Sequence, residues 1–294
     1  MRDILHHYEI RPDKPLKKEY LKLLELFDRI TRYLKINYFL VGAQARDLII
    51  SNVYNKSTGQ ATYDLDLAVC IEDWEKFNLL KVDLIKTGMF FESKQPHKLY
   101  FKEFDDQFSI PLDLIPFGKI ENKNSEIKWP PEMVFVMNVC GFSEAYLSSL
   151  LLKINENLTI SIASLPAMAV LKLIAWKERG RENLGKDASD FLLIALNYYE
   201  LGNLHRLYAE ETEILESVNY DPQLAGLHLL GRDAAGICYV LTKQHIQAIF
   251  TDEEFLQKLK DQLTSNQFIL RNNNIAQNIQ VYLDLFYKGF MKAN

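Results

Sequence analysis

The sequence has few cysteines and no long apolar run, and both features narrow the class of protein. Cys70, Cys140 and Cys238 are far apart, odd in number and outside any C-x-x-C pattern, which argues for reduced thiols and against structural zinc. No apolar segment approaches the roughly 20 residues of a membrane-spanning helix, and the start MRDILHHYEIRPDK lacks the apolar stretch of a signal peptide. We therefore expect a soluble, cytoplasmic protein without a membrane partner.

The sequence also lacks tandem repeats, extended low-complexity segments and a Walker-type G-x-x-x-x-G-K loop. Its formal net charge of −5 gives no general attraction for nucleic acid, although a local basic groove would still provide one. The chain does have a high content of hydrophobic residues. Its 294 residues, 48% of them hydrophobic, are enough for a substantial core and, by length, for two domains.

The first half of the chain mixes helical and strand patterns. Apolar spacing predicts a helix over 16–34, with Leu21, Leu24, Phe27, Ile30 and Leu34 on its apolar face, and further helices over 43–51 and 73–88. Strand patterns cover 36–42, 62–71, 98–104, 108–117, 133–139 and 158–163.

The second half is different, because helical periodicity continues over 165–179, 188–201 and 204–218 with no convincing strand. Ser164 suits an N-cap and Pro166 a first helical turn, which places a domain boundary there. The predicted fold class is α+β. A mixed sheet with flanking helices over 1–163 is followed by an all-helical domain over 164–294.

Three aspartates lie inside apolar strand segments, where an unpaired charge is costly to bury. Asp64 and Asp66 occur in TYDLDLAVCI, and Asp113 occurs in SIPLDLIPF. Because strand side chains alternate, Asp64 and Asp66 would share the face opposite Leu65, Leu67, Val69 and Ile71. If the strand of Asp113 runs alongside, the three carboxylates converge, and they would need a hard divalent cation such as Mg²⁺ or Mn²⁺ to neutralise them.

A glycine turn precedes these aspartates, in the segment FLVGAQARD. A strand ends at Gly42 and a helix begins near Ala43, so the free N–H groups of the helix are available to a phosphate. Arg46 in the first turn opposes the helix dipole, which is easier to explain if an anion binds nearby. His97 and Lys98, which begin the strand pattern before Asp113, are also placed to reach the site.

Each motif has a second interpretation. A D-x-D pattern arises by chance about once in a chain of this length, and the aspartates would then cap turns or lie at a solvated strand edge. Gly42 would mark an ordinary strand-to-helix turn with a surface arginine. The combination of three aspartates within apolar strands and an upstream glycine turn favours a functional site.

Together these residues resemble the nucleotidyltransferase superfamily with a polymerase-β-like palm. The matching elements are Val41-Gly42-Ala43, the D-x-D strand with Asp64 and Asp66, and the third acidic residue Asp113. Many members of the superfamily have serine where this chain has Ala43. The alanine lacks the hydroxyl group with which that serine would contact phosphate. The resemblance implies that Asp64, Asp66 and Asp113 are catalytic metal ligands, and that Gly42, Ala43 and Arg46 contact nucleotide.

A second segment, LKLIAWKERGRENLGKDASDFLLIA, resembles bacterial AbiEii/AbiGii-type nucleotidyltransferases, many of which are toxins of toxin–antitoxin pairs. The resemblance implies nucleotide-binding roles for the residues that match the motif, which are Lys172, Arg179, Lys186, Asp187 and Asp190. Lys172 and Arg179 are spaced to share a helix face. In the alternative interpretation these cations are solvated, and Asp187 is an N-cap with Asp190 in the first turn.

The implied activity is transfer of a nucleoside monophosphate from an NTP to an acceptor hydroxyl, with one Mg²⁺ at Asp64 and Asp66 and a second shared with Asp113. The acceptor classes are a tRNA end or other RNA, a protein, or a small molecule, and an antitoxin protein is an expected partner. Two other functions remain open. One is a non-catalytic palm-like module that binds nucleotide or a partner, and the other is a metal-dependent phosphodiesterase.

Overall fold

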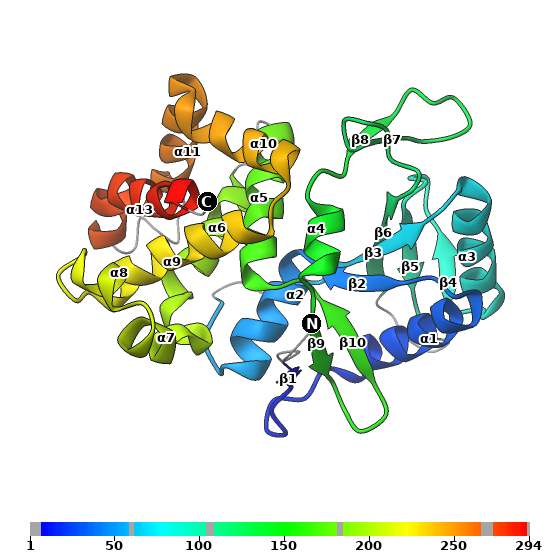
Figure 1. The fold of residues 1–294 in the computed structure, drawn as a ribbon. Helices are drawn as coiled ribbons and strands as arrows, with labels where there is room; N and C mark the ends of the chain where they lie inside the picture. Colours follow the sequence, from blue (N-terminus) through cyan, green and yellow to red (C-terminus); the bar gives the residue numbers. More distant parts are fainter. Residues whose placement is uncertain (1–6, 59–61, 104–108, 181–184, 266–272, 293–294) are drawn as a thin grey trace. The chain divides into compact units, whose positions relative to one another are not determined.

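A mixed β-sheet is the core of the first of two units, Met1–Ser164 and Leu165–Asn294, into which the chain divides (Figure 1). The computed structural model describes residues 7–58, 62–103, 109–180, 185–265 and 273–292. Within these ranges the main sheet has the strand order β1-β9-β10-β2-β3-β6-β5-β4, and β7 pairs with β8 separately. The strands are β1 (His7–Glu9), β2 (Tyr38–Val41), β3 (Leu65–Ile71), β4 (Phe90–Glu92), β5 (Lys98–Phe101), β6 (Ile110–Gly118), β7 (Glu126–Lys128), β8 (Val136–Asn138), β9 (Leu150–Lys153) and β10 (Thr159–Ile162).

The register at the centre of the sheet positions the aspartates. β3 runs parallel to β6 with Asp66 opposite Asp113, and antiparallel to β2 with Asp66 opposite Val41. β5 runs antiparallel to β6 and places Lys98 opposite Asp113. Residues opposite one another in adjacent strands project from the same face, so these four side chains share one face of the sheet.

Helices cover both faces of this sheet. The first unit contains α1 (Lys18–Leu34), α2 (Gly42–Asp47), the π-helix η1 (Leu48–Val53), α3 (Trp74–Lys86) and α4 (Phe142–Leu147). The ring of Tyr38 packs on Phe27 of α1, with centroids 5.0 Å apart, whereas the next residue, Phe39, packs on Phe117 and on Tyr146 of α4. Because successive strand residues face opposite ways, α1 and α4 lie on opposite faces, and the aspartates share the α4 face.

The elements of the first unit follow the predicted pattern with local differences. The predicted helix over 16–34 is α1, but its buried stripe consists of Tyr20, Leu23, Leu24, Phe27 and Thr31, while Leu21, Ile30 and Leu34 are only partly buried. The predicted helix over 43–51 begins as α2 and continues as η1. In the predicted strand 133–139, pairing with β7 starts only at Val136, and Val134 is 80% exposed.

The second unit contains helices throughout its described residues. They are α5 (Leu165–Arg179), α6 (Lys186–Asn197), the π-type segment η2 (Tyr199–Asn203), α7 (Leu204–Ala209), α8 (Thr212–Glu216), α9 (Pro222–Ile237), α10 (Val240–Thr251), α11 (Glu253–Thr264) and α13 (Asn273–Lys292). The predicted α+β fold class, a mixed sheet with helices followed by an all-helical region, is confirmed. Among the described helices, none has the length and apolarity to cross a membrane.

Two glycines allow α9 and α13 to pack closely. A Cβ added at Gly231 of α9 would overlap backbone atoms of Phe286 and Phe290, and one at Gly289 of α13 would overlap the carbonyl of His228. Gly236, also in α9, has open space where a Cβ would lie. Backbone contact at Gly231 therefore fixes the distance between the two helices, since a rigid backbone cannot yield as a side chain can.

We expect Gly231→Ala to lower the free energy of unfolding by about 1–3 kcal/mol, because the added methyl overpacks the interface between α9 and α13. Denaturant unfolding monitored by circular dichroism measures this loss. Gly236→Ala is the matched control and should leave stability unchanged or raise it by at most about 1 kcal/mol, through helix propensity alone. Equal losses in both variants would contradict the close approach.

Candidate active site

The carboxylates of Asp66 and Asp113 are neighbours because β3 and β6 pair in parallel and in register. Both residues are partly buried, whereas Leu65, Leu67, Leu112 and Leu114 beside them are fully buried. The alternation predicted from the sequence is therefore present on both strands. Asp64 lies two residues before Asp66, directly outside the first residue of β3, and is also partly buried.

Gly42 lies against the carboxylate of Asp66. Its φ is +75°, in the left-handed region that favours glycine, and a Cβ built at this position would collide with the carboxylate oxygen Oδ2 of Asp66. Glycine is required here for two reasons, the backbone conformation and the space occupied by Asp66. The sequence indicated only a turn between a strand and a helix at Gly42, and the contact with Asp66 depends on the tertiary pairing of β2 with β3.

The segment before Asp64 is anchored to α1. The hydroxyl of Tyr20 donates a hydrogen bond of 2.9 Å to the backbone carbonyl of Tyr63. Burial raises the pKa of Tyr20 to about 12, and the nearby negative charge of Asp64 contributes to the increase. Tyr20 therefore remains a hydrogen-bond donor at neutral pH and holds the chain next to Asp64 in place, a role that no sequence motif indicated.

Lys98 reaches the site, and His97 packs elsewhere. The Nζ of Lys98 lies 3.3 Å from Oδ1 of Asp113. The ring of His97 instead packs near Trp129 and Phe135, with centroids 5.8 and 6.1 Å away. Burial is the main cause of the lowered pKa of His97. Of the two residues that the sequence placed near Asp113, Lys98 makes the contact with its carboxylate.

The carboxylates have the donor chemistry of a hard divalent cation. Oδ1 of Asp113 is buried and makes no hydrogen bond, because the Lys98 ammonium is at ion-pair distance but outside hydrogen-bond geometry. This oxygen has an ion-pair partner but no hydrogen bond, and with the carboxylate of Asp66 it has the donor chemistry for Mg²⁺ or Mn²⁺. In the part of the chain that the structure describes, no group of three His, Cys, Asp or Glu side chains is spaced to hold a metal ion.

The predicted phosphate-binding residues of α2 are largely enclosed. Ala43 is 5% exposed and Arg46 is 4% exposed. Arg46 donates two hydrogen bonds, through Nε at 2.8 Å and Nη2 at 2.6 Å, to Oδ1 of Asp47. The charge that the sequence led us to assign to a bound anion is thus paired with a neighbouring carboxylate. The predicted place of Arg46 in the first helical turn is wrong, because Arg46 lies in the last turn of α2, where a cation does not oppose the helix dipole.

Four of the five residues predicted from the second segment form one ion-pair cluster in the second unit. Lys172 Nζ lies 3.0 Å from Asp187 Oδ1 and 2.6 Å from Asp190 Oδ2. Arg179 Nε lies 3.1 Å from Asp187 Oδ2. Lys172 and Arg179 share a helix face, as predicted from their spacing, because both contact Asp187. Lys186, the first residue of α6, is exposed.

Lys172, Asp187 and Asp190 of this cluster are buried, and the charges of the cluster are mutually compensated. Side-chain exposure is 12% for Lys172, 3% for Asp187 and 9% for Asp190. Burial alone would lower the pKa of Lys172, but Asp190 and Asp187 raise it above its ordinary value. Burial alone would raise the pKa of Asp187, but Lys172 and Arg179 lower it. Asp187 is not the N-cap of α6, because Gly185 occupies that position.

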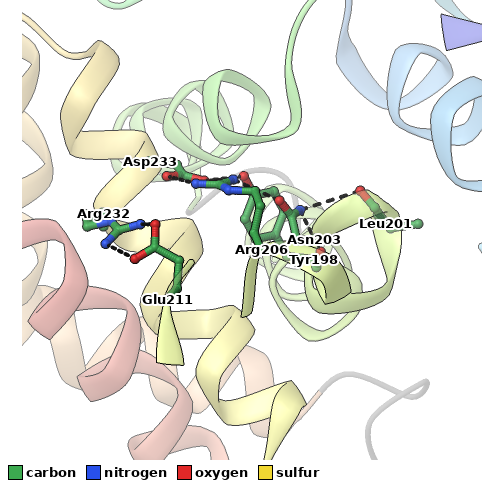
Figure 2. Close-up of polar contacts among 7 residues, drawn as sticks. All are labelled: Tyr198, Leu201, Asn203, Arg206, Glu211, Arg232 and Asp233. Atoms are coloured by element: carbon green, nitrogen blue, oxygen red, sulfur yellow. Dashed lines mark hydrogen bonds and ion pairs between the residues drawn. The ribbon is translucent and has the colours of Figure 1, made fainter. Parts of the chain in front are cut away.

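A second charged cluster, around η2, was not anticipated from the sequence (Figure 2). Arg206 donates to both oxygens of Asp233, at 2.7 and 2.9 Å, and the Tyr198 hydroxyl donates to Oδ2 of the same residue at 2.6 Å. Asn203 donates to the carbonyl of Tyr198 at 2.9 Å and accepts from Arg206 at 2.8 Å. These contacts tie the irregular segment η2 to α7 and α9, which is a structural role.

Arg232, next to Asp233 in α9, makes a separate ion pair with Glu211, also drawn in Figure 2. Two nitrogens of its guanidinium meet the two carboxylate oxygens of Glu211. The fork geometry makes this a strong pair for a half-buried position. The segment LLGRDAAGI, which carries no recognisable motif, thus supplies the charges that attach α9 to the α7–α8 region.

Comparison with known proteins gives distant structural likenesses. Neither a protein-family model nor a curated protein sequence matches the chain. Among solved structures, the chain is similar to an antigenic nucleotidyltransferase-like protein from Paracoccidioides brasiliensis, with 17% identity over 72% of this chain and 94% of that one, at a TM-score of 0.41.

Two further solved structures are also similar to the chain. The lincosamide antibiotic adenylyltransferase LnuA, bound to lincomycin, has 16% identity over 62% of this chain and 97% of its own, at a TM-score of 0.37. An apo form of a CCA-adding enzyme has 10% identity over 93% of this chain and 74% of its own, at a TM-score of 0.28. Scores this low say nothing about the reaction or the substrate, so the site must be interpreted from its own residues.

We expect Lys172→Met to lower the free energy of unfolding by about 3–5 kcal/mol at pH 7, because it leaves two buried carboxylates without their common cation. The lowered pKa of Asp187 contributes stability above the pKa of an unfolded aspartate, about 4, and this contribution is lost as the pH falls through the folded value. The deficit of the variant should therefore be full at pH 7 and shrink below about pH 4. Denaturant unfolding at a series of pH values measures both effects.

Lys186→Met is the matched control, since Lys186 is exposed and lies next to Asp187. It should change stability by no more than about 0.5 kcal/mol. A loss for Lys186→Met as large as that for Lys172→Met would show that the buried ion pairs do not account for the effect.

Proposed function

We propose that the chain is a Mg²⁺- or Mn²⁺-dependent nucleotidyltransferase that moves a nucleoside monophosphate from an NTP to an acceptor hydroxyl. The observation that carries this proposal is the in-register pair Asp66–Asp113 on adjacent parallel strands, with the Gly42 turn against Asp66. The low-scoring structural likenesses do not contribute to it.

In this proposal Asp64 and Asp66, with Asp113 beside them, would hold the divalent cation, which would supply charge neutralisation for the triphosphate and its leaving pyrophosphate. Asp113, a partly buried carboxylate in register with Asp66, would accept the proton of the acceptor hydroxyl. Asp66 is fixed between Val41 and Asp113 by strand pairing on both sides. A site on paired strands holds its groups more rigidly than one on loops.

Contact with the nucleotide at Gly42, Ala43 and Arg46 remains a prediction, as it does for Lys172, Arg179, Lys186, Asp187 and Asp190. Arg46 and Lys172 would need to exchange a carboxylate partner for a phosphate, since each is ion-paired and buried. Arg179, with 55% of its side chain exposed, and Lys186 are the cations of the second unit that a phosphate would reach most easily.

We expect Asp66→Asn and Asp113→Asn each to reduce transfer of label from radioactive NTPs by at least about 100-fold, the usual scale for losing a group that stabilises transition-state charge. The assay incubates the purified chain with each labelled NTP, Mg²⁺ and cell extract. Asp73→Asn is the matched control. Asp73 follows β3 but caps α3 by accepting from Lys76 N, and asparagine caps about equally well.

The labelled products separate the remaining functions. Pyrophosphate together with a labelled acceptor indicates transfer, whereas free nucleoside monophosphate indicates a phosphodiesterase. Nucleotide binding without Mg²⁺-dependent turnover indicates a non-catalytic module. Sensitivity of the labelled acceptor to ribonuclease or protease, or its passage through a small-pore filter, assigns it to RNA, protein or small molecules. Full label transfer by both asparagine variants would refute the assignment.

The narrower role, as the toxin of a toxin–antitoxin pair, stays a prediction from the resemblance of residues 172–190 to the AbiEii/AbiGii-type segment. We expect induced expression of the chain in bacteria to arrest growth and expression of Asp66→Asn to permit it. Colony counts after induction measure the difference, which should exceed about tenfold if transfer of nucleotide causes the arrest. Equal growth of both strains would exclude toxicity through this site.

A further inference from the structure

A lysine completes the row of charges on the α4 face of the sheet. The strand order β3-β6-β5 places Asp113 between Asp66 on one side and Lys98 on the other, each in register with it. Side chains directly opposite in adjacent strands are close neighbours. The candidate site is therefore a line of carboxylate, carboxylate and ammonium across three strands.

The side chains of the Lys98–Asp113 ion pair are partly buried. The two side chains are 21% and 22% exposed, with Nζ 3.3 Å from Oδ1. An ion pair at such a position interacts more strongly than one on an open surface, because the effective dielectric constant is lower. Oδ1 has no hydrogen bond, so Lys98 balances the charge of Asp113 while leaving that oxygen without a bound proton donor.

A second divalent cation bound at Asp113 would lie close to the ammonium group of Lys98. Mg²⁺ lies about 2.1 Å from its oxygen ligands. A cation at that distance from Oδ1 would be only a few ångströms from the positive charge of Lys98. Repulsion between the two disfavours a second metal ion, whereas a cation bound on the Asp64–Asp66 side of the row is farther from the ammonium.

We propose that Lys98 is the built-in cation of Asp113, so that the site takes one divalent metal ion, at Asp64 and Asp66, instead of two. This inference rests on the function proposed above and specifies the metal requirement of that same site. Lys98 acts as a positioning residue, because it orients and neutralises Asp113 without contacting the nucleotide.

The test measures Mn²⁺ binding to the full chain from the electron paramagnetic resonance signal of the free ion. We expect the unmodified protein to bind one Mn²⁺ per chain, and Asp66→Asn to lose it. Lys98→Met should bind Mn²⁺ at Asp113 at least about tenfold more tightly, the size expected when one positive charge is removed within several ångströms of a divalent ion. Lys98→Arg should bind as the unmodified protein does, because it keeps the charge.

Lys119→Met is the matched control. Lys119 pairs with Glu72 at 3.1 Å, just beyond the other ends of β6 and β3, where both side chains are more than half exposed. It should leave Mn²⁺ binding unchanged. Circular dichroism of each variant shows whether it is folded, and if Lys98→Met is unfolded, Lys98→Gln replaces it with a neutral polar side chain.

The outcomes separate the inference from the proposed function. Two Mn²⁺ ions on the unmodified protein, or unchanged Mn²⁺ affinity in folded Lys98→Met, would overturn the single-metal site even if label transfer from NTPs is observed. A tenfold effect of Lys98→Met without label transfer from any NTP would overturn the proposed function. The expected Mn²⁺ count and affinity change, together with label transfer, support both.

Discussion

The parallel register of β3 with β6 is the constraint on which the candidate active site depends. It places Asp66 directly beside Asp113, an arrangement that like charges oppose and that must be compensated nearby. Lys98, in register on β5, supplies part of that compensation. A slip of one residue would turn Asp113 toward the face covered by α1 and place Leu112 or Leu114 beside Asp66. The apolar residues on either side of each aspartate therefore hold the site together.

The second unit also pairs its enclosed charges internally. The buried Lys172 pairs with Asp187 and Asp190, and the partly buried Arg206 pairs with Asp233 (Figure 2). Breaking such pairs is costly because the remaining charge is left without a partner in a medium that solvates it poorly. Residues that a motif assigns to ligand binding can thus have a structural role, because their ion pairs stabilise the packing of the helices. In this unit, the burial of each side chain distinguishes structural from accessible charges.

The sequence was sufficient to predict the elements with strong periodicity and to identify the aspartates. The apolar pattern over 165–179 matches α5, and the alternation around Asp66 and Asp113 matches β3 and β6. The strands β1, β4, β7 and β9, which have three or four residues each, were not predicted from the sequence. The continuation of α2 as a π-helix, and the ion pairs of Arg46 and Lys172, depend on packing that no local pattern specifies.

The contact between Gly42 and Asp66 changes what a glycine at this position signifies. A larger residue at position 42 would be excluded by the aspartate on the neighbouring strand, whether or not a nucleotide ever binds. The two positions are therefore expected to vary together among proteins that share this turn. Where a residue with a smaller side chain replaces the aspartate, the steric reason for the glycine disappears. A glycine here thus reflects the left-handed backbone of the turn together with the neighbouring carboxylate, and evidence for phosphate recognition has to come from other residues.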